Sequence, residues 1–148
     1  MAEVAVVYGS KSDEEVMKGA FDVLNEFGIV YESKVLSAHR QPDETAEFAK
    51  SVSSYGVKII IAGAGLSAAL PGVIASHTLL PVIGVPIGGG HLNGVDALYS
   101  IVQMPKGIPV AAVGISNAKN AALLAVEILA LSDKSLTRKL TEYRSKNK

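Results

Sequence analysis

The stretch Val4-Ala5-Val6-Val7-Tyr8-Gly9-Ser10-Lys11-Ser12-Asp13 contains the pattern that determines the fold. A short β-branched run that ends at a glycine is typical of a strand buried on both faces of a parallel sheet. After Asp13, apolar side chains follow at helical spacing until Gly28, and they are Met17, Ala20, Phe21 and Leu24. A strand followed at once by a helix is the first half of a β-α-β unit.

The same alternation continues along the chain. Further strands are predicted at 30–36, 57–62, 80–85 and 110–115, and further helices at 42–54, 68–77, 95–104, 117–131 and 133–145. This order predicts one α/β domain over residues 1–148, a three-layer, doubly wound parallel sheet of about five strands with a C-terminal helix. In such sheets ligands bind beyond the carboxyl ends of the strands, near the point where the strand order reverses.

The composition narrows the class of protein. With 49% hydrophobic and 19% charged residues in 148, we expect a sheet covered on both faces and an outer surface that partly serves as an oligomer interface. Fourteen basic residues balance fourteen acidic ones, which gives no electrostatic case for nucleic acid or an anionic membrane. There is no cysteine, which excludes disulfides and thiolate catalysis. We see neither a secretory signal nor a membrane-length apolar run and expect a cytoplasmic protein.

The loop after the first predicted strand, Gly9–Asp13, has the composition of an anion site. It opens a helix, where backbone amides and the positive end of the helix dipole face a ligand. The alternative is an ordinary helix cap formed by Ser12 or Asp13. The loop matches neither a P-loop nor a dinucleotide-binding glycine turn, so ATP and NAD are not expected.

The loop after the second predicted strand, Ser37–Pro42, carries two groups suited to chemistry. Arg40 offers a planar set of five donors that fits a phosphate, and His39 is of the residue type that exchanges protons near neutral pH. A histidine and an arginine in a surface loop are usually inert. Their position on the ligand side of the sheet favours a function.

Two glycine-rich loops follow. In Gly63–Gly72 the small residues leave room for a flat ring, or they simply allow tight strand–helix packing, and Ser67 is a candidate helix cap. The loop 86–96 contains four glycines and is a candidate lid, from which His91 either approaches the site or stays in solvent. We expect His77 at a helix end or an interface. Three scattered histidines without acidic partners argue against a metal centre.

Taken together, these loops resemble one known family. The segments that carry the resemblance appear in family order over about residues 3–145, and they are Gly-Ser-Lys-Ser-Asp at 9–13, Ser-Ala-His-Arg-x-Pro at 37–42, Ala-Gly-Ala-Gly at 62–65, Leu-Pro-Gly at 70–72, Pro-Val-Ile-Gly-Val-Pro at 81–86, Gly-Val-Asp-Ala-Leu-Tyr-Ser-Ile-Val-Gln-Met-Pro at 94–105 and Asn-Ala-Ala-Leu-Leu-Ala at 120–125. The chain closely resembles the PurE family of purine biosynthesis, with a flavodoxin- or Rossmann-like sheet.

The resemblance implies an enzyme that acts on aminoimidazole ribonucleotides. One form of the family moves a carboxylate from N5 of N5-carboxyaminoimidazole ribonucleotide to ring carbon C4, and a second form carboxylates 5-aminoimidazole ribonucleotide directly with CO2. The resemblance further implies a homo-octamer without cofactor or metal. It assigns His39 as general acid and base. The residues it assigns to substrate binding are Ser10, Asp13, Ser37, Arg40, Gly65, Ser67 and Leu70.

One position departs from the pattern of the first form. Ala69 stands where that form usually has a second histidine, but the Arg-Ser-Asn pattern usual in the second form is absent too. We therefore prefer the mutase and keep direct carboxylation as the alternative. We also consider a non-catalytic nucleotide-binding module, which would tolerate loss of His39. His91 is a candidate to replace the missing histidine.

Overall fold

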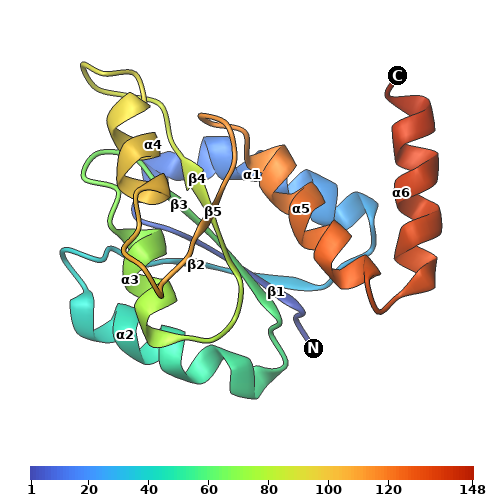
Figure 1. The fold of residues 1–148 in the computed structure, drawn as a ribbon, viewed down its shortest axis with the longest axis horizontal. Coiled ribbons are helices and arrows are strands. Elements are labelled where there is room, and N and C mark those ends of the chain that lie inside the picture. The colour runs from blue at the N-terminus through green and yellow to red at the C-terminus, as the bar shows by residue number, and fades with distance from the viewer.

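The computed structural model describes residues 1–148 and contains a single five-stranded sheet whose strands all run parallel (Figure 1). The strand order is β2-β1-β3-β4-β5. The strands are β1 (Val4–Tyr8), β2 (Tyr31–Val35), β3 (Ile59–Ala64), β4 (Val82–Pro86) and β5 (Ala111–Ala112). The predicted fold class is confirmed.

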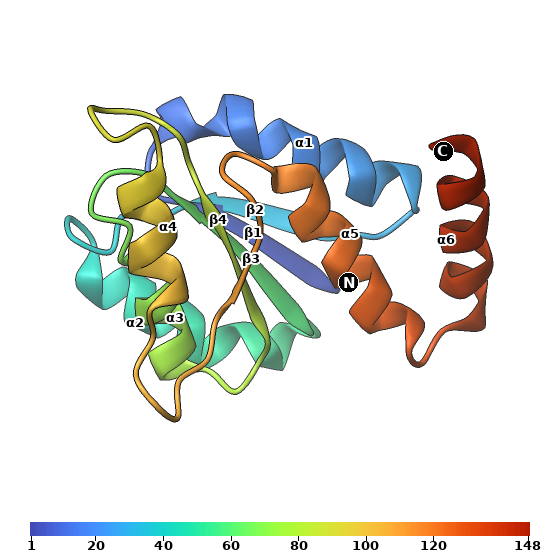
Figure 2. The same cartoon turned by 45° about the horizontal axis from the view of Figure 1, so that its top comes forward.

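Helices cover both faces of this sheet. They are α1 (Glu14–Glu26), α2 (Pro42–Ser51), α3 (Leu70–His77), α4 (Val95–Val102), α5 (Ala118–Ala130) and α6 (Lys134–Lys146). The first core cluster joins β1, β3 and β4 to α1 and α5, and the second joins the opposite face of the sheet to α2, α3 and α4. Figure 2 shows the two helical layers, with α6 set apart beside α1 and α5. None of these helices has the length and apolarity needed to cross a bilayer.

The central strand β1 illustrates why these residues form this sheet. All five of its residues are buried, and successive side chains point to opposite faces. Val4 and Val6 therefore enter the first cluster, while Ala5 and Val7 enter the second. A strand that is apolar on both sides is stable only between two helical layers.

Several predicted boundaries were wrong in informative ways. Strand β3 continues through Ala64, so Gly63 belongs to the sheet and not to the following loop. A Cβ atom at Gly63 would lie 2.5 Å from Sδ of Met17, which explains the glycine as a packing requirement. Strand β5 has only two residues where 110–115 was predicted, because the chain turns at Gly114, whose carbonyl accepts a hydrogen bond from the amide of Asn117 at 3.0 Å.

Two helices also end earlier than the sequence predicts. Helix α2 ends at Ser51 and a 3₁₀ turn (η2, Val52–Tyr55) follows to Gly56, which has a φ of +92°. Helix α4 ends at Val102, two residues before the predicted end. Pro105 lies just beyond and disfavours continued helix in the residue that precedes it.

Candidate active site

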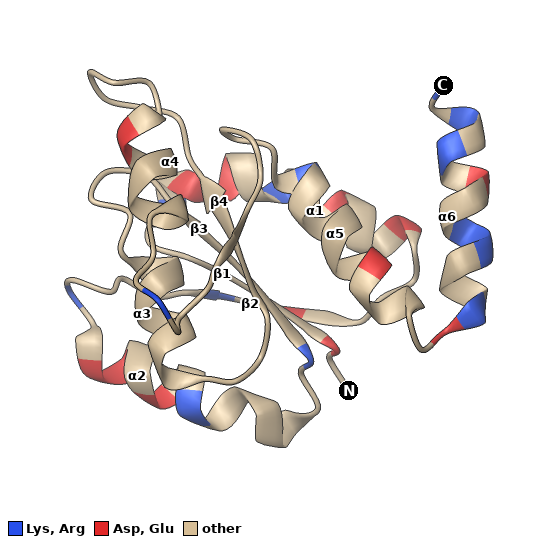
Figure 3. Ribbon diagram, viewed as in Figure 1, with Lys and Arg blue, Asp and Glu red and all other residues tan.

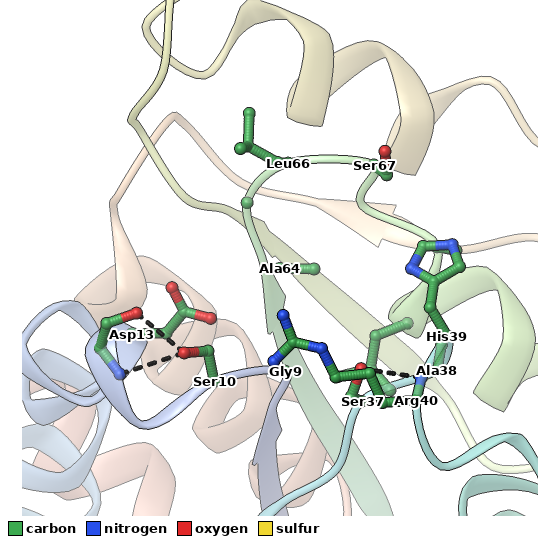
Figure 4. A pocket seen from close by; sticks show the side chains of 14 residues that line it. Gly9, Ser10, Asp13, Ser37, Ala38, His39, Arg40, Ala64, Leu66 and Ser67 are labelled. Carbon is green, nitrogen blue, oxygen red and sulfur yellow. Dashed lines mark hydrogen bonds between the residues drawn. The ribbon is translucent and has the colours of Figure 1, made fainter.

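A pocket of about 460 Å³ lies at the carboxyl edge of the sheet and is lined by fourteen residues. The lining comes from the loops that follow β1, β2 and β3 (Figure 4). The chain leaves β1 towards β2 on one side and reaches β3 on the other, so the pocket lies where the strand order reverses. This is the position at which parallel sheets of this kind bind ligands.

A larger hollow between β2 and α2 is a weaker candidate for a phosphorylated ligand. Its lining includes four carboxylates and a single lysine, and the carboxylates are Glu32, Asp43, Glu44 and Glu47 (Figure 3, acidic residues in red). A dianionic phosphate would be repelled there. The pocket at the carboxyl edge instead has one arginine, several hydroxyl groups and one carboxylate.

The loop after β1 is organised by Ser10. Its hydroxyl accepts a hydrogen bond from the amide of Ser12 at 3.3 Å, and its carbonyl accepts one from the amide of Asp13 at 3.0 Å. Ser10 thus caps a 3₁₀ turn (η1, Lys11–Asp13), and neither Ser12 nor Asp13 is the side-chain cap that the alternative interpretation required. The Asp13 carboxylate is left free to face the pocket.

Burial raises the pKa of the Asp13 carboxyl, against a smaller opposing effect of the hydrogen bond with the Ser10 backbone. No cation forms a salt bridge with Asp13. A half-buried carboxylate without a cationic partner is short of hydrogen-bond donors. It can accept hydrogen bonds from hydroxyl groups of a ligand.

The loop after β2 is held by its own polar groups. The Ser37 hydroxyl accepts a hydrogen bond from the amide of Arg40 at 3.2 Å, and the side-chain oxygen of Gln41 accepts one from the amide of Ser37 at 3.3 Å. The Ser37 carbonyl accepts a third bond, from the amide of Gln41 at 2.8 Å. These bonds fix the turn and leave the side chains of His39 and Arg40 without partners in the protein.

Figure 4 shows how these two side chains lie. The guanidinium of Arg40 extends across the pocket towards Gly9 and Ser10, and the imidazole of His39 stands at the other side, near Ser67. Both residues line the pocket and both are exposed. The guanidinium and the imidazole are therefore placed to contact different parts of one ligand.

The loop after β3 provides small residues. Ser67 has a φ of +49°, and the amide of Ala69 donates to the Ser67 carbonyl at 2.6 Å, which makes the turn tight. The residue that caps α3 is Ala69, so the prediction of Ser67 as a helix cap was wrong. The hydroxyl of Ser67 is instead exposed at the pocket.

The structure brings almost all of the predicted residues together. The eight that line the pocket are Ser10, Asp13, Ser37, His39, Arg40, Gly65, Ser67 and Leu70. His91 does not line it, and its side chain is exposed on the loop between β4 and α4. No group of three or more His, Cys, Asp or Glu side chains is arranged to hold a metal ion.

The prediction missed Leu66, which lines the pocket and is 71% exposed. The sequence held a signal for it, because Leu66 is a bulky residue inside a run of glycine, alanine and serine. That contrast indicates a side chain kept for contact at a surface rather than for the core.

The chain is similar to known proteins over nearly its whole length. Residues 3–148 match the family described as AIRC, AIR carboxylase. The chain is 53% identical over 148 residues to the N5-carboxyaminoimidazole ribonucleotide mutase of Thermotoga maritima. The aligned region covers 100% of this chain and 86% of that protein. It is 58% identical over 137 residues to the mutase of Aquifex aeolicus, with 93% and 82% covered.

Two further relatives bear on the alternatives. The phosphoribosylaminoimidazole carboxylase of Saccharomyces cerevisiae is 52% identical over 140 residues, which is 95% of this chain but 24% of that protein. A crystal structure of Treponema denticola PurE superposes with a TM-score of 0.89 at 32% identity, covering 97% of this chain and 90% of that one.

Proposed function

The chain belongs to the AIR carboxylase family, and from this premise we propose that it converts N5-carboxyaminoimidazole ribonucleotide to 4-carboxy-5-aminoimidazole ribonucleotide in purine biosynthesis. Relatives named as mutases at 53% and 58% identity over nearly the whole chain support the reaction. The observation that carries the proposal is the pocket itself. It is lined by an imidazole and a guanidinium without partners in the protein, together with serine hydroxyl groups and small residues.

Substrate binding would divide between the first two loops. Arg40 is suited to the phosphate because a guanidinium donates two parallel hydrogen bonds to oxyanions. Ser10 and Ser37 add hydroxyl donors on the same side. Asp13 cannot attract a phosphate and would instead accept hydrogen bonds from the ribose hydroxyls, consistent with its free carboxylate.

His39 would move the protons. The bond between N5 and the carboxylate carbon breaks, CO2 forms, and the protonated imidazole gives its proton to N5. The enamine-like carbon C4 then attacks CO2, and the neutral imidazole removes the C4 proton, which restores the aromatic ring. The proton lost in the first step is regained in the last, so a single group that exchanges protons near neutral pH suffices.

The third loop would keep CO2 close to C4. Gly65 and Ala69 present little side-chain volume, and their surroundings are closed on the sheet side by buried Ala64 and Leu70. Recapture of CO2 competes with its escape, and confinement beside C4 favours recapture because it replaces a bimolecular encounter with a local one.

Direct carboxylation of 5-aminoimidazole ribonucleotide with CO2 is the second candidate. Ala69 in place of the usual histidine favours it, as does the similarity to the yeast carboxylase. A substrate choice assay separates the two. We expect rapid product from N5-carboxyaminoimidazole ribonucleotide, and product only from 5-aminoimidazole ribonucleotide with bicarbonate would contradict the mutase.

We further propose that His91 substitutes for the missing histidine. Its loop lies beyond β4, and the tip would have to close over the pocket to bring the imidazole in. A His91→Asn variant should then lose most of its turnover while the fold is unchanged. Unchanged turnover would reject this role.

The assembly is a separate proposal. Exposed apolar side chains gather on α4, including Val95, Tyr99 and Val102. Large exposed apolar patches are unusual in monomers, and we propose that they are covered in a homo-octamer that works in the cytoplasm. Light scattering on the purified protein would give the mass of eight chains, and the mass of a monomer would contradict this.

A further inference from the structure

The loop between β4 and α4, residues 88–94, has a closely packed base, formed by its two end residues Gly88 and Gly94. The amide of Gly88 donates to the Ser116 hydroxyl at 2.9 Å. Gly94 is buried, and a Cβ atom there would lie 2.6 Å from Cγ2 of Ile115 and 3.0 Å from Cα of Gly88. The two ends of the loop therefore lie against each other, and the base has no room for larger residues.

The tip of the same loop lies in solvent. Residues 89–92 are all exposed, and nothing lies within 4 Å of the Cβ position of Gly89. Gly90 has a φ of +66°, and the residue that enters the base, Asn93, also has a positive φ, of +53°. A fixed base with a glycine-rich tip is the form of a loop that moves as a unit.

Gly90 in this tip lies against Leu66, one of the residues that line the pocket. A Cβ atom at Gly90 would lie 2.9 Å from Cδ2 of Leu66, so the leucine side chain occupies the space next to the glycine. The first residue after β4, Ile87, donates its amide to the carbonyl of Ala64 at 2.9 Å and ties the two loops together below this contact. Figure 4 shows Leu66 at the rim, beyond Ala64.

We propose that the tip of loop 88–94 closes over the pocket by packing on Leu66, and that Leu66 is a positioning residue that keeps CO2 in the pocket during carboxyl transfer. This inference rests on the proposed mutase function. CO2 is a small, apolar molecule, and an apolar cover both blocks its exit and excludes the water that would hydrate it. The absence of a side chain at Gly90 lets the tip approach the leucine.

The first test measures how often CO2 escapes from the pocket relative to how often it is recaptured at C4. With N5-carboxyaminoimidazole ribonucleotide as substrate, the Leu66→Ala protein should release severalfold more 5-aminoimidazole ribonucleotide per molecule of product than the wild type, after subtraction of the loss without enzyme. KM should change little. Leu79→Ala is the matched control, because Leu79 is fully exposed and lies outside the pocket lining. An unchanged ratio in Leu66→Ala would overturn the proposal.

The second test asks whether Leu66 and Gly90 act together. Gly90→Ala alone should raise the same ratio, because its methyl group collides with Leu66 and its φ is unfavourable. In the Leu66→Ala background the same change should add less, since the collision is gone. Strictly multiplicative effects of the two changes would contradict a shared contact.

A third measurement distinguishes failure of the closing loop from failure of the proposed mutase function. Hydrogen exchange of the amides in residues 88–94 should slow when 5-aminoimidazole ribonucleotide binds to the wild type, and it should slow less in Leu66→Ala. A wild type that makes no product would reject the mutase function, whereas exchange that does not respond to the ligand would reject the closing loop.

Discussion

The loops that follow β2 and β3 face each other across the pocket and are built in opposite ways. In Ser37–Gln41, side-chain oxygens of Ser37 and Gln41 fix the turn, and the other long polar side chains are left free. In Gly65–Ala69 no side chain fixes the turn, and a positive φ at Ser67 with a short backbone bond does so instead. In the proposed reaction, the first loop (37–41, the polar loop) would supply the groups that act, and the second (65–69, the small-residue loop) would set the space in which they act.

This difference predicts different consequences of substitution. Changes in the polar loop should remove a chemical step or an ion contact and leave the pocket shape intact. Changes in the small-residue loop should leave the chemistry available but alter the geometry. Both expectations can be broken by single variants.

The largest effect is expected for His39→Asn. The variant keeps a polar side chain of similar size but cannot exchange a proton, so kcat should fall on the order of 10³-fold, within the range typical of general acid–base catalysis. Binding of 5-aminoimidazole ribonucleotide, measured by calorimetry, should persist. His77→Asn is the control, because His77 is exposed and lies outside the pocket lining. A His39→Asn protein that turns over normally would support a binding module or another proton carrier.

Arg40→Ala should act on binding instead. Loss of a charge-assisted hydrogen bond costs about 1.5–3 kcal/mol, which raises KM roughly 10- to 150-fold. The kcat should change much less, since the guanidinium is directed away from His39 towards Gly9 and Ser10. Steady-state kinetics give both values, with Arg138→Ala in α6 as the control. A fall confined to kcat would contradict the assignment of Arg40 to the phosphate.

Ala69→Leu tests the opposite loop. The larger side chain would reduce the space in the pocket that Ala69 and His39 both line, and it would displace the ring of the substrate. Displacements of about 1 Å can cost on the order of 10²-fold in rate. We expect a loss of about tenfold in kcat/KM with an unchanged circular dichroism spectrum. Activity equal to that of the wild type would mean that the small residues serve packing alone.

The smallest effect concerns stability and pH. Because burial raises the pKa of Asp13 above its ordinary value of 3.8, the folded protein retains this proton to higher pH than the unfolded chain. The resulting stabilisation is complete below pH 3.8 and is lost as the pH rises through the raised pKa. Asp13→Asn should therefore be slightly more stable than the wild type at pH 7, by no more than about 0.5 kcal/mol.

Thermal unfolding at several pH values checks whether Asp13→Asn is more or less stable than the wild type. The stability advantage of Asp13→Asn over the wild type should shrink as the pH falls towards 3.8. Independently of this, the KM of the variant should be higher than that of the wild type, because an acceptor for the ribose hydroxyls is lost. A variant that is less stable than the wild type at pH 7 would show that the carboxylate stabilises the fold, although no cation pairs with it.

The polar loop could be predicted from sequence more completely than the small-residue loop. Buried strands such as β1 are recognisable because they are apolar on both faces. The parallel order that they imply then places the loop Ser37–Pro42 at the carboxyl edge, although it follows the exposed edge strand β2. The end of β3 could not be predicted in this way. Gly63 has the same composition signal whether it lies in a loop or, as here, packs against Met17 from another element.

The contact between Leu66 and Gly90 could not be predicted either. The two residues are 24 positions apart, and their approach depends on the path of two loops whose backbones adopt positive φ values. Sequence patterns report the period of strands and helices, and loops of this kind have no period. The absence of His91 from the pocket lining has the same origin.

The central claim is that the carboxyl group moves within one pocket between the two loops, with His39 carrying the proton. Its most direct test uses N5-carboxyaminoimidazole ribonucleotide with ¹³C in the carboxyl group, in a buffer of unlabelled bicarbonate. The account predicts that nearly all of the first-turnover product carries ¹³C on the carbon attached to C4. Product whose carboxyl carbon matches the bicarbonate in solution would contradict it.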